Sequence, residues 1–179
     1  KSKKRLAQNA HKMGEAPVIY DPTLTQASID QLQQAMKNYG YFQATVDTAT
    51  QTKKQKINVT YLITANEPYT IRDYKADFAQ TDLKEFASNR FVKIHEGDKF
   101  STNLLDDERQ RLSSAMRRHG YYYFDKSFLR YEADSTVAQH EIDLEIKMQD
   151  YVDNLPDSLQ QRLYHQYYIS KVCFHTDYP

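Results

Sequence analysis

The sequence has one cysteine, no tryptophan and only four glycines, and what it lacks excludes several kinds of protein. Cys173 stands alone, so no disulfide can form within the chain. No stretch approaches the roughly 20 apolar residues that span a bilayer, so we expect no direct membrane insertion by this segment. The 24 basic residues are balanced by 24 acidic ones, which leaves no net field to attract nucleic acid. We therefore expect no nucleic acid among its partners.

Signatures of catalysis are also missing. There is no glycine-rich phosphate loop, no strand–turn–helix serine motif and no zinc-binding helix motif. The six histidines are scattered, and only Cys173 and His175 lie close enough along the chain to share a metal ion. A zinc site normally needs three or four ligands, so we expect no metal site. We expect a protein that is not an enzyme, with no catalytic residue and no cofactor.

The sequence does contain a motif that occurs twice. Six residues recur 80 positions later with the same identities: Leu24, Leu32, Ala35, Met36, Gly40 and Tyr41 correspond to Leu104, Leu112, Ala115, Met116, Gly120 and Tyr121. In both copies the spacing of the apolar residues predicts a helix, the glycine predicts its end, and the aromatic residues predict a strand that begins at once. The chain is therefore expected to consist of small α+β units in tandem.

Other patterns fill in the two units. Residues 57–63 and 142–148 alternate between apolar and polar side chains, which predicts two strands with one buried face. In the first unit we expect a helix over residues 6–13 that ends at Gly14, then a helix capped by Thr25 or Ser28 that runs to about Tyr39.

The second unit adds elements at its front. We expect an opening strand over residues 71–78, a short helix capped by Asp82, and a turn at 96–98. Ser101 is expected to cap a longer helix. The helix dipole favours acidic residues in the first turn of a helix and basic residues in the last turn. We expect Asp106, Asp107 and Glu108 in the first turn of this helix, and Arg117, Arg118 and His119 in its last turn. The expected order is strand, helix, helix, strand, strand.

A unit of this order, in which helix, glycine and tyrosine lead into a hairpin, resembles a POTRA domain. Such domains belong to the outer-membrane assembly factors typified by BamA and TamA, the surface antigen family. Residues 14–21 and 37–42 are similar to the TamA-like lipoprotein members of Bacteroidetes. The resemblance implies an α+β fold of tandem βααββ units, each a three-stranded mixed sheet packed on two helices. It divides the chain into a domain at 1–67 that lacks its first strand, a complete domain at 68–150, and a connection with the first strand of a further domain at 151–179.

The resemblance also implies a function. It is that of a periplasmic arm of an outer-membrane protein in a Gram-negative bacterium, which binds unfolded outer-membrane proteins or accessory assembly subunits. Clients would pass to a C-terminal β-barrel of the same protein. Two alternatives stay open: a docking scaffold for an inner-membrane-anchored partner, and the arm of a transporter dedicated to one exported protein.

Edge strands offer a mechanism, because an extended client can bond to their unpaired backbone groups. The expected edges run over residues 41–49 and 121–133, and the second is richer in aromatic side chains. Its expected client-binding residues are Tyr121, Tyr122, Tyr123, Phe124, Phe128 and Tyr131. The alternative is that alternate rings are buried under the helices. Gly40 and Gly120 are expected to be structural helix stops; a hinge is the alternative.

Overall fold

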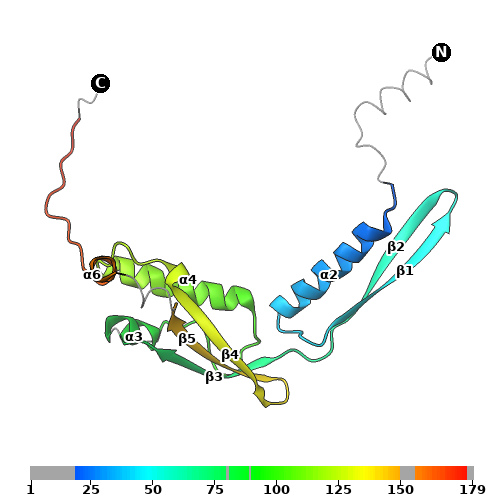
Figure 1. Ribbon diagram of the computed structural model, residues 1–179, viewed down its shortest axis with the longest axis horizontal. Helices are drawn as coiled ribbons and strands as arrows, with labels where there is room; N and C mark the ends of the chain where they lie inside the picture. The colour runs from blue at the N-terminus through cyan, green and yellow to red at the C-terminus, as the bar shows by residue number, and fades with distance from the viewer. Residues whose placement is uncertain (1–18, 80, 89, 150–155, 177–179) are drawn as a thin grey trace. The chain divides into compact units, whose positions relative to one another are not determined.

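The structure is a computed structural model that describes residues 19–79, 81–88, 90–149 and 156–176 (Figure 1). It divides into two compact units. The first holds residues up to Gln34 together with Thr45–Thr64, and the second holds Ala35–Ala44 and Ala65 onward. The helix expected at 6–13 and its stop at Gly14 lie outside the described residues.

The helix of the first repeat, α2 (Pro22–Asn38), starts earlier than the sequence suggested. Its cap is Asp21, whose carboxylate accepts a hydrogen bond from the Thr23 backbone N–H at 2.8 Å. Pro22 then occupies the first helical position, where its fixed φ suits the helix and no N–H is needed. The expected caps Thr25 and Ser28 are therefore wrong: both lie inside the helix.

Two antiparallel strands, β1 (Thr45–Lys53) and β2 (Lys56–Thr64), form the sheet of the first unit. The hairpin turns through Lys54 and Gln55, both with positive φ, which fits a two-residue turn of the primed type. Strand β1 begins at Thr45 and not at Tyr41, because a turn follows Gly40 first.

The second unit has the expected βααββ order. It runs β3 (Thr70–Asp77), α3 (Thr81–Ala87), α4 (Thr102–Arg118), the 3-10 turn η1 (Lys126–Phe128), β4 (Leu129–Ala138) and β5 (Glu141–Met148). The strand order is β3-β5-β4, with β5 parallel to β3 and antiparallel to β4. This mixed three-stranded sheet confirms the predicted fold class.

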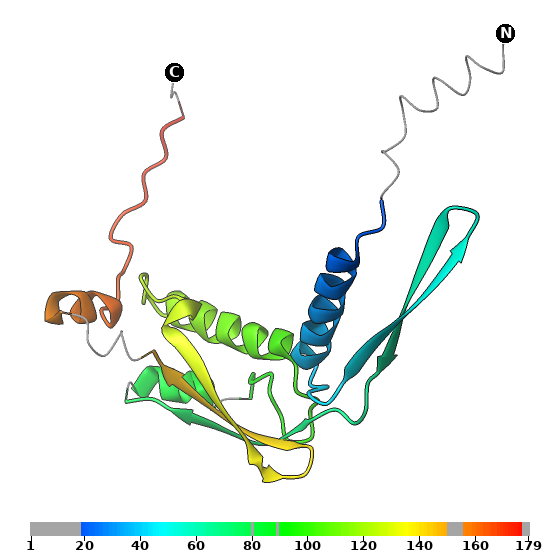
Figure 2. The ribbon, with the colours of Figure 1, turned by 45° about the vertical axis from the view of Figure 1, so that its right-hand side comes forward.

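Helices α3 and α4 pack on the same face of this sheet (Figure 2). The core between the two layers contains Leu83 from α3, Leu112 and Met116 from α4, and Leu129 and Ile146 from the strands, all fully buried. Of the four β5 residues predicted to face inward, Ile142, Leu144 and Ile146 are buried and Met148 is half-buried.

The acidic run of α4 is not in its first turn, so the expected dipole role is wrong. Ser101 is at the N-cap position, but its side chain makes no capping hydrogen bond. Glu108 lies two turns into the helix and is fully buried. Its carboxylate pairs with the Arg111 guanidinium at 2.6 Å and accepts the Lys93 backbone N–H at 3.0 Å. These partners compensate the loss of water around a buried charge.

After β5 the described chain resumes with α6 (Asp157–Leu163) and then a segment without regular structure up to residue 176. The first strand of a further domain was expected within residues 151–179, but the structure assigns no strand among the described residues 156–176. No described strand pairs with this segment, and a strand needs the ladder bonds of a neighbour. No helix in the described part of the chain has the length and apolar character needed to cross a membrane.

Candidate client-binding edge

The six aromatic residues expected on one strand do not share one, and this expectation is wrong. Strand β4 begins only at Leu129, after a turn and the 3-10 turn η1. Tyr121 and Phe124 are instead buried in the core, three residues apart on a tight turn. The Phe124 backbone N–H donates to the Tyr121 carbonyl at 3.0 Å, which closes that turn. Burial makes these two rings unavailable to a client.

Two further rings of the set are half-buried. Phe128 meets the Phe124 ring edge-on at 5.9 Å. Tyr131 lies on β4, and its hydroxyl donates to the Leu105 carbonyl at 3.2 Å. Burial raises the pKa of Tyr131 well above its usual range, so its hydroxyl stays protonated and keeps this bond. Both rings serve the packing of the sheet on α4.

The remaining two, Tyr122 and Tyr123, are exposed by 64% and 51%. Their rings meet edge-on at 5.1 Å. The Tyr167 ring, from the segment after α6, lies 5.4 Å from Tyr123 and 6.4 Å from Tyr122. These three residues form a tyrosine cluster on the surface. Tyr167 was not among the expected residues, because no local pattern links it to a residue more than 40 positions earlier.

Strand β4 is an edge strand, as expected for the strand after Gly120. The Gln149 backbone N–H donates to the Phe128 carbonyl at 2.7 Å, so the even-numbered residues of β4 turn their backbone groups toward β5. Leu129, Tyr131 and Ala133 consequently direct theirs outward. Within the described residues no strand pairs with this side of β4.

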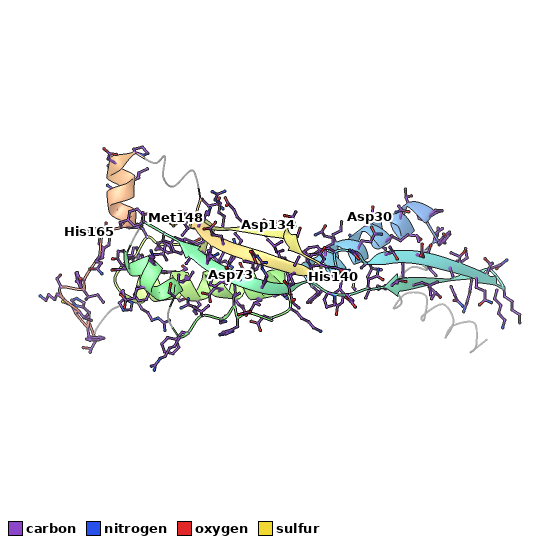
Figure 3. All side chains as sticks on the ribbon, turned by 90° about the horizontal axis from the view of Figure 1, so that it is seen from below. Asp30, Asp73, Asp134, His140, Met148 and His165 are labelled. Atoms are coloured by element: carbon purple, nitrogen blue, oxygen red, sulfur yellow. The ribbon has the colours of Figure 1, made fainter. Side chains whose placement is uncertain are left out.

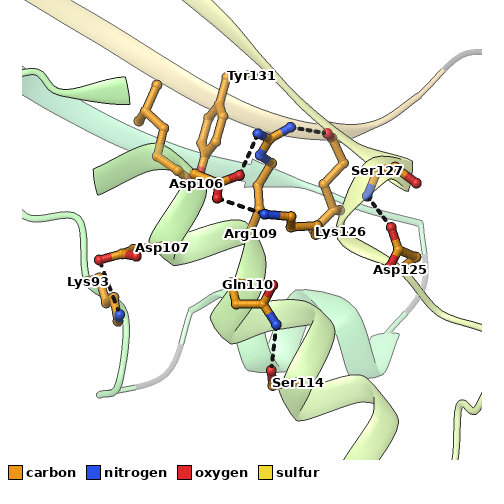
Figure 4. A network of polar contacts seen from close by, with 12 residues as sticks. Lys93, Asp106, Asp107, Arg109, Gln110, Ser114, Asp125, Lys126, Ser127 and Tyr131 are labelled. Atoms are coloured by element: carbon orange, nitrogen blue, oxygen red, sulfur yellow. Dashed lines mark hydrogen bonds and ion pairs between the residues drawn. The ribbon is translucent and has the colours of Figure 1, made fainter. Parts of the chain in front are cut away.

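A polar network covers the start of that edge (Figure 4). Arg109 Nη1 donates to the outward carbonyl of Leu129 at 3.4 Å, and its Nη2 donates to Asp106 at 2.8 Å. Lys126 Nζ also donates to Asp106 at 2.7 Å, and this bond holds the pKa of Asp106 below its usual value. A strand added to β4 therefore has open backbone groups from Tyr131 onward, whereas Leu129 is already engaged.

The face of the sheet that points away from the helices carries mainly charged side chains. Three aspartates stand side by side across the strands, Asp73 on β3, Asp143 on β5 and Asp134 on β4; Asp73 and Asp134 are labelled in Figure 3. The Arg72 guanidinium bonds to Asp143 and holds its pKa below the usual range, which relieves part of the repulsion. This face is unsuited to apolar side chains of a client, which leaves the edge of β4 and the tyrosine cluster.

Gly40 and Gly120 both follow a helix with positive φ, +84° and +94°, as expected of helix stops. Each glycine also accepts a backbone hydrogen bond from a tyrosine later in the chain. The Gly40 carbonyl accepts the Tyr69 N–H at 2.9 Å, and the Gly120 carbonyl accepts the Tyr167 N–H at 2.8 Å. A Cβ at Gly40 would lie 2.7 Å from the Phe100 carbonyl oxygen, and one at Gly120 would lie 3.0 Å from that of Tyr167. The repeat thus extends to a contact that the sequence did not indicate.

Residues 4–66 match the model of the POTRA family, described as the surface antigen variable number repeat. The chain contains a POTRA domain. The matched residues are those of the first repeat, and the second repeat has the βααββ order expected of the same kind of domain. No curated protein matches the chain.

Several solved structures are similar to the chain at low identity. One is BamA from Haemophilus ducreyi lacking POTRA domains 1–3, with 17% identity, a TM-score of 0.44, and coverage of 76% of this chain and 25% of that one. Another is POTRA3–5 of Haemophilus influenzae BamA, with 14% identity, a TM-score of 0.38, and coverage of 76% of this chain and 52% of that one. A third is POTRA1–3 of Omp85 from Anabaena, with 15% identity, a TM-score of 0.34, and coverage of 69% of this chain and 49% of that one. The chain thus spans between a quarter and about half of these structures.

Proposed function

We propose that the chain is part of the periplasmic arm of a BamA/TamA-like outer-membrane assembly factor in a Gram-negative bacterium. In this role it binds unfolded outer-membrane proteins or accessory subunits and passes them to a C-terminal β-barrel of the same protein. The family match of residues 4–66 supports the arm, since POTRA domains are the periplasmic part of such factors. The proposal includes the division into domains at 1–67, 68–150 and 151–179.

The observation that carries client binding is the outer edge of β4. The backbone groups of Tyr131 and Ala133 point outward, and no described strand pairs with them. An extended client adds to such an edge through main-chain hydrogen bonds, which accept almost any sequence. The exposed rings of Tyr122 and Tyr123 supply an apolar surface in the same unit.

The test is an NMR titration of the chain with extended peptides from outer-membrane β-strands. We expect shifts of the β4 amides, above all those of Tyr131 and Ala133. Ala133→Pro removes an outward N–H without touching the ladder to β5, so it should weaken binding while the fold persists. Ala133→Thr keeps the N–H and is the matched control. Equal binding by both variants would refute strand addition at this edge.

The tyrosine cluster is tested separately. Replacing Tyr122 and Tyr123 by Ser should weaken peptide binding, because a client loses contact with two exposed rings. Tyr39 is similarly exposed but lies away from β4 in the sequence and outside the cluster, so Tyr39→Ser is the control. If both changes have the same effect, the rings have no specific part in binding.

A second candidate function, docking of a folded partner, is favoured by one other surface. Phe86, Phe91, Ala115 and His119 line an open, mainly apolar hollow on the helical side. Phe91 is largely exposed there. Such a hollow suits a side chain from a folded partner better than an extended strand. Shifts confined to these residues, with β4 unaffected, would favour docking.

A further inference from the structure

The apolar hollow on the helical side is built by α3, by α4 and by Phe91 in the connection between them. Arg111 Nη2 donates to the Phe86 carbonyl at 2.8 Å, which fixes the end of α3 against α4. The Phe86 ring packs on the His119 ring, with 4.4 Å between their centroids. The volume of the hollow is about 550 Å³, within the usual range of ligand pockets, about 300–1,000 Å³. It can therefore hold an aromatic side chain, and the rings that line it gain free energy from being covered.

Both charged side chains that line this hollow are basic. Arg111 is neutralised by the Glu108 carboxylate at 2.6 Å. The Nε of the other, Arg118, donates to a carbonyl one turn earlier in α4 at 3.2 Å, and in the described part of the chain no carboxylate pairs with its Nη atoms. A further cation, Arg90, lies over the Phe91 ring, 4.9 Å from its centre. Arg118 is therefore the guanidinium that a ligand in the hollow can reach without displacing an acid.

A second, polar hollow adjoins the first along α4. The two hollows share Arg111 and Arg118, and the polar hollow is otherwise lined by Lys93, Asp107, Gln110, Ser114 and Arg117. The Lys93 ammonium lies 3.6 Å from the Asp107 carboxylate, so these two charges largely cancel. Arg117 has no carboxylate partner among residues 19–79, 81–88, 90–149 and 156–176. The polar hollow therefore places a second uncompensated guanidinium beside the apolar one.

We infer that the two hollows together bind a folded partner that presents an aromatic side chain with carboxylates beside it. The ring enters the apolar hollow and covers Phe86 and Phe91, while the carboxylates face Arg117 and Arg118. An aromatic anchor in a pocket supplies much of the energy of an interface, and opposite charges beside it favour the correct partner. A basic partner is repelled at the same place. The inference rests on the second candidate function, docking of a folded partner, and is independent of strand addition to β4.

The test uses the full chain and a fluorescein-labelled peptide, Asp-Glu-Phe-Glu-Asp, whose binding is measured by fluorescence anisotropy. NMR of the chain with this peptide locates the site, and we expect shifts of the Phe91 and His119 amides and none in β4. Exchanging the phenylalanine of the peptide for alanine should weaken binding about tenfold or more, and so should exchanging its four acids for asparagine and glutamine. Both changes leave the protein itself intact, so a loss of folding cannot explain them.

Two variants of the chain test the same contacts from the other side. Arg118→Glu should weaken binding of the acidic peptide about tenfold and strengthen binding of Lys-Lys-Phe-Lys-Lys, because the charges are then exchanged. Lys37 is exposed in the last turn of α2, so Lys37→Glu changes the net charge equally and is the control. Phe91→Ser should also weaken binding. Tyr39→Ser removes a ring of similar exposure, 55% against 62%, and should leave binding unchanged.

Equal effects of Arg118→Glu and Lys37→Glu would overturn the inference, and so would shifts confined to β4 or no binding of the acidic peptide. Tighter binding of a single-stranded oligonucleotide, or self-association of the chain that Phe91→Ser abolishes, would assign the hollows to another occupant and overturn it as well. Client binding is measured with different peptides, those from outer-membrane β-strands. If these shift β4 while the acidic peptide does not bind, the inference about the hollows fails and strand addition stands.

Discussion

Gly40 offers a direct measure of how much its close contact with Phe100 contributes to stability. Gly97 has nearly the same φ, +85° against +84°, but a Cβ there would meet nothing within 4 Å. At Gly40 a Cβ would lie 2.7 Å from the Phe100 carbonyl oxygen and 3.3 Å from the Phe100 Cβ. The pair Gly40→Ala and Gly97→Ala therefore separates the cost of the backbone conformation from the cost of the clash.

Both substitutions should lose about 1–2 kcal/mol of unfolding free energy, because an L-residue is strained at positive φ. Gly40→Ala should lose about 1–3 kcal/mol more, the usual penalty of inserting a methyl group into a packed site. The opposing carbonyl cannot retreat freely, because Phe100 is buried and its N–H donates to the Tyr69 carbonyl at 2.9 Å. We expect the two penalties to add, since the clash and the strain arise from different atoms.

Urea unfolding followed by circular dichroism measures the difference, and hydrogen exchange of the β3 and β5 amides assigns it to the second unit. Faster exchange in those strands should accompany Gly40→Ala. An equal loss for both variants would refute the reasoning, because it would leave the close approach to Phe100 without energetic effect.

Three other outcomes are expected. Arg111→Met should cost about 3–5 kcal/mol, because it leaves the fully buried Glu108 carboxylate without its guanidinium partner. Glu108→Leu added to it should restore part of the loss in urea unfolding, and no restoration would contradict the pairing. Arg72→Gln should raise the pKa of Asp143 toward the usual aspartate value in an NMR titration, and an unchanged pKa would mean that the guanidinium is not its cause. The melting temperature should fall as the pH drops below about 4 and hold steady above it. The reason is that folding lowers the pKa of five carboxyl groups, so these groups stabilise the fold when ionised and lose that effect when protonated: Asp106, Asp125, Glu132, Asp134 and Asp143. A melting temperature that stays constant from pH 6 to pH 2 would contradict this.

Most patterns that depend on neighbours in the sequence were interpreted correctly. The alternation of 142–148 predicted β5 because one face of that strand meets the helices and the other meets water. Gly40 and Gly120 follow their helices with positive φ because the chain must reverse there without a Cβ. The cap at Asp21 was also present in the sequence, as an aspartate directly before a proline, and was overlooked.

Patterns whose meaning depends on distant residues were read wrongly. The aromatic run after Gly120 has the composition of a strand, yet Tyr121 and Phe124 turn into the core, where Leu83 and Met116 come from two other elements. The acids of α4 suited the dipole of a helix start, but Glu108 faces Arg111 and the Lys93 backbone in the interior. Composition alone does not distinguish a solvated carboxylate from one that loses its water and is paired.

The sequence by itself determined the repeat, the βααββ order and the residues at which the helices end, because these follow from local periodicity and from the conformational freedom of glycine. Only the tertiary structure decided which tyrosines are exposed and that Arg109 covers the start of the β4 edge. It also decided that the carbonyls of Gly40 and Gly120 accept hydrogen bonds from the N–H groups of Tyr69 and Tyr167, far along the chain. These features join atoms from segments far apart in the sequence, and their positions depend on how the layers pack.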